Sequence, residues 1–130
     1  MERVEEVTYL DTHVVAWLYG GELDQLSKTA IEEIQKGSPI ISPMVILELQ
    51  YLFEIGRANA PAAKVVETLK QTIGLSVCGL PFEKVVESAL YHNWGREPFD
   101  RLIVAHAAAN DAALITKDER IRRHYKRAVW

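Results

Sequence analysis

The feature that most restricts the fold is the alternation of short apolar runs with segments of helical length. Four runs have the composition of buried strands, and they are Val7–Leu10, Pro39–Ser42, Leu75–Cys78 and Ala113–Thr116. Strands that are joined by helices of this length form right-handed crossovers and pair in parallel. The alternation therefore predicts an α/β protein whose mostly parallel sheet is covered by helices on both faces.

Capping residues and helix breakers mark where the helices begin and end. Ser27 and Ser42 are suitable N-caps, prolines such as Pro43 open first turns, and glycines close several segments. These signals predict helices over residues 12–19, 27–36, 43–56, 61–74, 81–92 and 99–110, followed by a short basic helix after Asp118. The last apolar segment, residues 128–130, is assigned to no element.

Length and composition predict one ordinary globular domain that spans residues 1–130. The chain is 48% apolar and 25% charged, and nothing divides it into two parts. No apolar run approaches the roughly 20 residues of a membrane span, and the start at Met1 is acidic where a signal peptide is basic. We therefore expect a cytoplasmic protein that does not associate with a membrane. The single cysteine, Cys78, is expected to pack in the core.

The net charge of −3 is not that of a protein that wraps nucleic acid by bulk electrostatics. Basic residues are nevertheless concentrated between Lys117 and Arg127. This segment has two interpretations, a solvated helix face or a phosphate-binding patch, and the sequence does not choose between them.

Two aspartates follow predicted strands. Asp11 comes directly after the first strand, and Asp118 comes two residues after the fourth. Ligands of open parallel sheets bind outside the carboxyl ends of the strands, so both acids can lie at one rim. Each could also act only as the N-cap of the helix that follows it.

Glu48 is an acid that the helical pattern directs inward. On a helical wheel it falls within the apolar stripe Met44, Leu47, Tyr51, Leu52 and Ile55, opposite Gln50 and Glu54. A carboxylate in an apolar setting costs several kcal/mol unless a cation or hydrogen-bond donors compensate it. The compensating partner is a bound metal ion or a buried Arg or Lys that forms a structural ion pair.

Asp100 completes the set of acids, because it opens a helix that is apolar on nearly every side. The helix dipole alone explains an acid at that position, but such a helix is buried and its start faces a rim. Four carboxylates at one rim repel one another unless a hard divalent cation such as Mg²⁺ or Mn²⁺ is bound. Such an ion can activate water for hydrolysis of a phosphodiester.

These acids lie in motifs that resemble the PIN-domain family, and most closely its VapC-type toxins. The motifs are Tyr9-Leu-Asp-Thr-His-Val-Val-Ala-Trp-Leu, Ser42-Pro-Met-Val-Ile-Leu-Glu-Leu, Pro98-Phe-Asp-Arg-Leu-Ile-Val-Ala-His-Ala and Leu114-Ile-Thr-Lys-Asp. Their order and spacing agree with the family over essentially the whole chain. The resemblance implies a three-layer α/β/α sandwich and a metal-dependent ribonuclease, the toxin of a type II toxin-antitoxin pair.

The resemblance also implies roles for individual residues. Asp11, Asp100 and Asp118 correspond to metal-ligating acids, and Glu48 to the acid that completes the catalytic site. Thr116 corresponds to a supporting hydroxyl residue. Further candidates for contact with RNA are Arg101, for which a structural salt bridge is an equal alternative, Lys117 and Trp94. The implied partners are the RNA substrate, a small antitoxin protein and a second copy of the chain in a homodimer.

Two other classes of protein remain as alternatives. A receiver-like signalling domain also binds Mg²⁺ at strand ends, but it needs paired acids after its first strand, where Asp11 stands alone. A catalytically silent PIN-fold binding module would keep the fold and only engage a partner. Among the residues not assigned to the site, His106 is expected to be a hydrogen-bonded structural histidine and Trp17 to be core.

Overall fold

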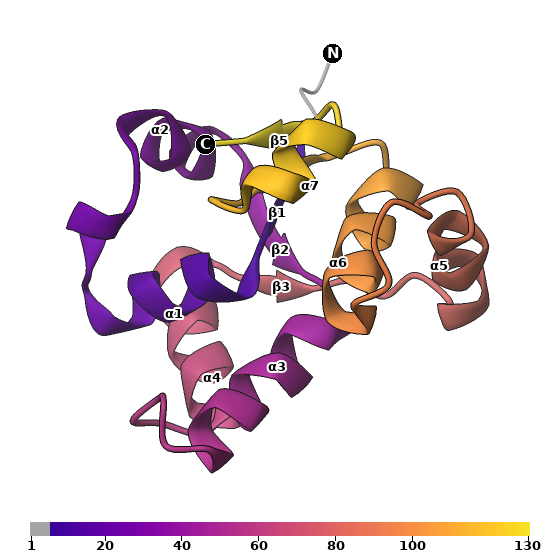
Figure 1. Ribbon diagram of the computed structural model, residues 1–130. Helices are drawn as coiled ribbons and strands as arrows, with labels where there is room; N and C mark the ends of the chain where they lie inside the picture. Colours follow the sequence, from indigo (N-terminus) through magenta and orange to yellow (C-terminus); the bar gives the residue numbers. More distant parts are fainter. Residues whose placement is uncertain (1–5) are drawn as a thin grey trace.

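The computed structural model describes residues 6–130 and has a five-stranded sheet at its centre (Figure 1). All paired strands are parallel, in the order β3-β2-β1-β4-β5. The strands are β1 (Val7–Leu10), β2 (Ser38–Ile41), β3 (Ser76–Val77), β4 (Ala113–Ile115) and β5 (Ala128–Val129). The predicted parallel α/β fold is confirmed. The apolar end that the sequence left unassigned supplies the fifth strand. Residues 1–5, which contain most of the acidic start, lie outside the described residues.

The helices agree closely with the capping signals. They are α1 (Thr12–Gly20), α2 (Lys28–Lys36), α3 (Pro43–Glu54), α4 (Ala62–Ile73), α5 (Phe82–Ala89), α6 (Pro98–Ala109) and α7 (Glu119–His124), with a 3-10 turn at Leu23–Gln25 that was not predicted. Ser27 Oγ accepts a hydrogen bond from Ala30 N, and Ser42 Oγ accepts one from Met44 N. Within residues 6–130, no helix combines the length and apolarity that a membrane crossing requires.

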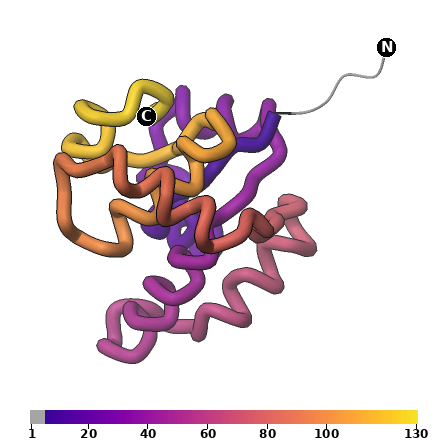
Figure 2. Tube along the Cα trace, turned by 90° about the vertical axis from the view of Figure 1, so that its right-hand side faces the viewer, coloured from indigo at the N-terminus to yellow at the C-terminus, as the bar shows by residue number. Residues whose placement is uncertain are grey.

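The order of the strands explains the three layers. From β1 to β3 the chain moves in one direction across the sheet, and for β4 and β5 it returns to the other side of β1. Because such crossovers are right-handed, the helices of the two halves cover opposite faces. In Figure 1, α5 and α6 stand together on the right, away from α1 and α4. The ends of α3 and α4 project together at the bottom of both views (Figures 1 and 2).

The change of direction between β1 and β4 positions the site. The helices that follow these two neighbouring strands leave toward opposite faces, which opens a crevice at their carboxyl ends. Leu10 is paired with Ile115, and Asp11 N donates a hydrogen bond to Ile115 O at 3.1 Å. Residues that follow β1 and β4 are therefore neighbours in space.

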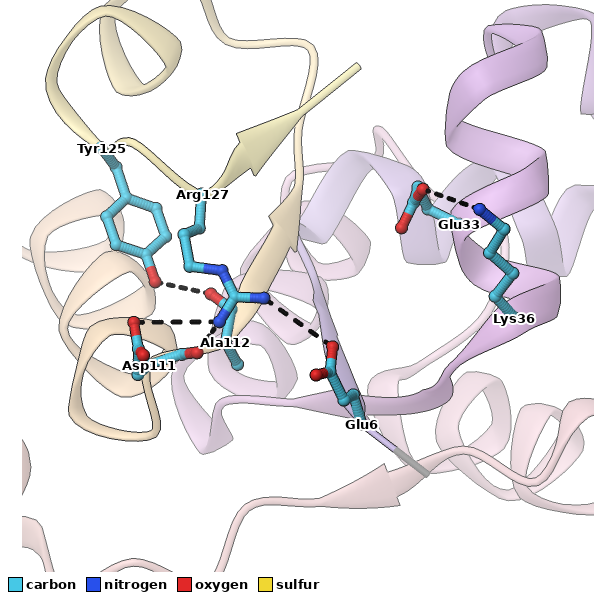
Figure 3. A network of polar contacts seen from close by, with 7 residues as sticks. All are labelled: Glu6, Glu33, Lys36, Asp111, Ala112, Tyr125 and Arg127. Carbon is cyan, nitrogen blue, oxygen red and sulfur yellow. Dashed lines mark hydrogen bonds and ion pairs between the residues drawn. The ribbon is translucent and has the colours of Figure 1, made fainter. Parts of the chain in front are cut away.

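At the opposite edge, where the strands begin, charged groups are paired (Figure 3). The Arg127 guanidinium lies 3.8 Å from the Glu6 carboxylate and 3.8 Å from the Asp111 carboxylate. Tyr125 OH donates a hydrogen bond to Ala112 O at 2.5 Å. These contacts join the segments that precede β1, β4 and β5.

The apolar stripe that was expected to form the buried side of α3 is wrong at several positions. Its buried side is formed by Val45 and Leu49, whereas Leu47, Tyr51 and Ile55 are 42%, 47% and 64% exposed. Because α3 is apolar around most of its circumference, the hydrophobic pattern does not identify which side faces the sheet. Glu48 lies beside the buried Leu49 and is half-buried.

Gly37 allows β2 to lie close to β1, which predicts a specific sensitivity. A Cβ at Gly37 would lie 2.2 Å from Thr8 Oγ1 and 3.0 Å from Glu6 O, whereas one at Gly79 meets nothing within 4 Å. Gly37→Ala is expected to lower the free energy of unfolding by about 1–3 kcal/mol. Gly79→Ala should change it by less than about 1 kcal/mol. Urea unfolding of both variants tests this, and equal stabilities would contradict the close approach.

Candidate active site

A pocket of about 560 Å³ opens at the carboxyl ends of β1 and β4. The residues that line it are Asp11, His13, Val14, Trp17, Glu48, Glu97, Asp100, Lys117 and Asp118. The structure thus brings together all four acids that the sequence singled out. It adds a fifth, Glu97, that the sequence analysis missed. This carboxylate pocket is the candidate active site.

The carboxylate of Asp11 accepts two hydrogen bonds at the end of β1. Its Oδ1 accepts a hydrogen bond from Thr12 N at 2.8 Å, and its Oδ2 accepts one from Thr116 Oγ1 at 2.6 Å. Thr116 Oγ1 also accepts from Asp118 N at 3.1 Å. Burial raises the pKa of Asp11, and these hydrogen bonds oppose the rise. Thr116 therefore connects the two strand-end acids, a position that matches the supporting role implied by the resemblance.

Glu48 reaches the same pocket from α3. Its Oε1 accepts a hydrogen bond from the hydroxyl of Thr12, a residue that is fully buried at the start of α1. Burial raises the pKa of Glu48, and the nearby charge of Asp11 raises it further. Within residues 6–130 no Lys or Arg forms an ion pair with Glu48. The alternative of a structural ion pair is therefore not what compensates this carboxylate.

The surroundings of Asp100 also disfavour its charged form. Burial, followed by the charges of Asp11, Glu97, Asp118 and Glu48, raises its pKa to about 7. Glu97 is the N-cap of α6, and its Oε2 accepts a hydrogen bond from Asp100 N at 2.6 Å. The signal that could have identified Glu97 is its place directly before Pro98, the first residue of the helix.

Asp118 both caps a helix and lines the pocket, the two roles that the sequence left open. Its Oδ1 accepts a hydrogen bond from Ile121 N at 2.9 Å, so it is the N-cap of α7. The same side chain lines the carboxylate pocket. Capping and site formation are thus not exclusive, because a strand end at a sheet rim is also where the next helix begins.

The pocket has an excess of negative charge. No ion pair of residues 6–130 includes any of its five acids, and Lys117 is the one lysine or arginine among its described lining residues. Oxygen donors of this kind suit Mg²⁺ or Mn²⁺. No three His, Cys, Asp or Glu side chains within residues 6–130 already form a metal-binding group. Mg²⁺ does not require one, because it retains several waters and binds through one or two carboxylates.

Arg101 and Trp94, which the sequence suggests as contacts for RNA, lie outside the carboxylate pocket. Arg101 Nε donates a hydrogen bond to Ala89 O at 3.0 Å, so it joins α6 to the end of α5 and is not in the carboxylate pocket. Trp94 is stacked on His124, with ring centroids 5.0 Å apart and planes 2° apart. Arg101 and Trp94 line a smaller neighbouring cavity together with Asp100 and Asp118.

Trp17 packs against the core as expected, but it is only half-buried and also lines the carboxylate pocket. His13, on the first turn of α1, also lines the pocket and was missed. His106 is buried as expected. Its Nδ1 lies 2.8 Å from Ser42 Oγ and 3.0 Å from Leu102 O, and burial lowers its pKa.

A family model for the PIN domain matches residues 8–127. The chain belongs to the PIN-domain family. A relative from Mycobacterium tuberculosis, Ribonuclease VapC22, is 31% identical over 122 residues, which are 88% of this chain and 89% of the relative. The resemblance inferred from the four motifs is confirmed.

Solved structures with the same fold come from VapBC complexes. VapBC2 of Rickettsia felis, bound to a DNA fragment from the promoter, has a TM-score of 0.66 at 16% identity and covers 95% of this chain and 96% of its own. VapBC-1 of nontypeable Haemophilus influenzae has a TM-score of 0.63 at 17% identity with the same coverage. At these identities the likeness shows the fold alone.

The receiver-like alternative does not agree with the observed sheet. Receiver domains have the strand order 2-1-3-4-5, in which the third strand lies beside the first. Here β4 lies beside β1, and β3 is at the far edge next to β2. The PIN-domain assignment and the topology are therefore consistent with each other.

The raised pKa of Asp100 predicts how stability depends on pH. Its folded-state pKa of about 7 lies above the unfolded value near 4, so its contribution to stability is complete below about pH 4 and is lost as pH rises through about 7. In EDTA, Asp100→Asn should raise the melting temperature more at about pH 7.5 than at about pH 5.

Asp24→Asn is the matched control, because Asp24 is exposed in the turn at Leu23–Gln25 and lies outside the pocket. It should produce no comparable difference between the two pH values. A gain for Asp100→Asn that is independent of pH would contradict the role of charge repulsion.

Proposed function

We propose that this PIN-domain protein is a metal-dependent endoribonuclease and the toxin of a type II toxin-antitoxin pair. The observation that carries the proposal is the convergence of five carboxylates in one pocket where no described ion pair neutralises them. The relative named Ribonuclease VapC22, which aligns over most of both chains, supports RNA as the substrate.

In this proposal Asp11, Glu48, Asp100 and Asp118 hold Mg²⁺ or Mn²⁺ and form the catalytic site. When bound, the cation supplies a water of lowered pKa and stabilises the negative charge that develops on the phosphodiester. The donor set supports this assignment, because burial and the charges of the neighbouring acids together raise the pKa of Asp100 to about 7, and a divalent cation would relieve that repulsion.

The chain itself orients the acids before any substrate is present. The hydroxyl of Thr116 fixes Asp11, and the hydroxyl of Thr12 fixes Glu48. Both threonines are fully buried, so their hydrogen bonds are shielded from water. With its pKa raised to about 7, Asp100 exchanges its proton near neutral pH, and a bound cation would favour its ionised form.

Positive charge near the pocket supports an anionic substrate. Lys117 lies at the pocket itself, and α7 places Arg120, Arg122 and Arg123 on an exposed surface that follows Asp118. These side chains can attract an RNA backbone to a rim that would otherwise repel it. Arg101 Nε is engaged with Ala89 O, and a contact of its remaining guanidinium nitrogens with RNA stays a prediction.

Protein partners form part of the same proposal. The structural neighbours are toxin-antitoxin complexes, which supports a small antitoxin protein as a partner of this chain. Large apolar side chains are exposed on α3 and at α5, among them Tyr51, Ile55, Phe82 and Leu90. Such surfaces support an antitoxin contact and a homodimer. The cytoplasmic location expected from the sequence stays a prediction.

The proposal is tested by cleavage of RNA. Purified protein should cleave RNA with Mg²⁺ or Mn²⁺ and stop in EDTA. Asp11→Asn and Asp100→Asn should each lower the rate by at least about 100-fold, because each removes a charged ligand from the pocket. Gel electrophoresis of a labelled RNA measures the rate, and circular dichroism shows that the variants remain folded.

Asp24→Asn removes one acidic charge outside the pocket and should keep the parent rate. Unchanged cleavage in both pocket variants would place the active site elsewhere. No cleavage by parent protein that binds antitoxin and RNA would identify a catalytically silent binding module.

A further inference from the structure

We propose that Trp17 forms a subsite on which a nucleobase stacks beside the carboxylate pocket, and that Lys117 contacts the adjoining phosphate. The inference rests on the proposed ribonuclease function and adds the residues that select an unpaired nucleotide. Trp17 comes from the middle of α1, and Lys117 from the loop between β4 and α7.

The ring of Trp17 is placed as a wall of the pocket. It is half-buried and lines the same space as Asp11, Asp100 and Asp118. Its neighbours support it without stacking on it. The ring of Trp130 is 6.1 Å away and tilted by 54°, and that of His13 is 5.9 Å away and tilted by 45°. Within residues 6–130 no ring lies parallel to the Trp17 indole.

Trp94 provides a direct contrast, because its indole is already stacked. His124 lies parallel to it with ring centroids 5.0 Å apart, whereas the rings beside Trp17 are tilted. A cation lies near each indole, Arg120 at 5.8 Å from Trp94 and Lys117 at 5.9 Å from Trp17, so only the ring of His124 distinguishes the two. Trp94 also lies outside the carboxylate pocket. A base that enters the pocket therefore meets Trp17 and not Trp94, which revises the sequence-based choice of Trp94.

Lys117 places its ammonium group over the face of the Trp17 indole, at the same pocket as the acids. Its Nζ is 5.9 Å from the Trp17 ring centroid, and the residue lies between Thr116 and Asp118 in the chain. Lys117 is exposed and takes part in no ion pair of residues 6–130. Its long side chain is therefore available to a phosphate at the edge of an acidic pocket.

The size of the pocket agrees with a site that holds both a metal ion and part of a nucleotide. A volume of about 560 Å³ falls within the range of pockets that bind small molecules and exceeds what a single ion needs. An aromatic ring and a cation side by side match the base and the phosphate of one nucleotide. Because the faces of a base inside a duplex are covered by its stacked neighbours, the subsite selects unpaired RNA.

The first test compares two substitutions of Trp17 in steady-state cleavage of a single-stranded RNA. Trp17→Leu keeps an apolar side chain but removes the aromatic face, and it should raise KM by about 10- to 100-fold with kcat within about threefold. Trp17→Phe retains a ring and should keep KM within about threefold. Thermal unfolding identifies any loss of fold.

Tyr91→Leu is the control, because it removes an exposed aromatic ring that lines neither the carboxylate pocket nor the neighbouring cavity, and it should leave KM within about threefold. If the parent cleaves RNA while Trp17→Leu has the KM of the parent, the inference fails and the proposed function stands. A fall in kcat that Trp17→Phe does not rescue would show that Trp17 only supports the fold.

A second test reads binding without cleavage. In Asp11→Asn protein with Mg²⁺, the indole N–H signal of Trp17 is assigned by comparison with Trp17→Phe and followed by NMR. Hexauridylate should shift this signal more than that of Trp94, and the corresponding abasic hexamer should not. This result would support the subsite even if the parent cleaved no RNA. Equal shifts with both oligomers would overturn it.

Lys117 is tested through the dependence of KM on salt. Lys117→Gln should reduce the slope of log KM against log salt concentration by about 0.7, the loss of one phosphate contact on a single strand. Lys126→Gln removes an exposed lysine outside the pocket and should leave the slope unchanged. Equal slopes for Lys117→Gln and the parent would exclude a phosphate contact.

Discussion

The parallel pairing of β1 with β4 is the constraint on which the rest of the site depends. It places Asp11 beside Thr116, a separation of 105 residues in the chain, and the hydroxyl of Thr116 then donates to the Asp11 carboxylate at 2.6 Å. Because the sheet changes direction between these strands, the helices that follow them diverge and leave a pocket. Helices α3 and α6 add Glu48 and Asp100 to a rim that already exists.

The two edges of the sheet show opposite electrostatic arrangements. Where the strands begin, Arg127 forms ion pairs with Glu6 and Asp111, so a cation there offsets part of the acidic charge and links neighbouring segments. Where the strands end, five acids share a pocket with one lysine among its described lining residues. Stability alone favours the first arrangement, and the second raises the pKa of Asp100 to about 7. A cluster that costs stability in the absence of a cation is typical of a functional site.

Much of the fold and the identity of four acids could be predicted, because the responsible interactions are local. Ser27 and Ser42 cap their helices as expected, and Asp11 and Asp118 follow the strands that were expected. The apolar stripe of α3 was misplaced, since that helix is apolar on several sides and only contact with the sheet selects Val45 and Leu49. Glu97 and Trp17 were not assigned to the site, because a cap and an apolar helix explained each of them locally.

By itself the sequence determined the alternating elements, their caps and a set of acids that the PIN-domain motifs mark. These depend on hydrophobic periodicity, backbone capping and side-chain type, which act over a few residues. Only the tertiary structure decided that Glu97 and Trp17 face the pocket, that Arg101 is engaged with Ala89 and that Trp94 is stacked on His124. The reason is that pockets form between segments distant in sequence, where each side chain's neighbours follow from the order of the strands and the faces that the helices cover.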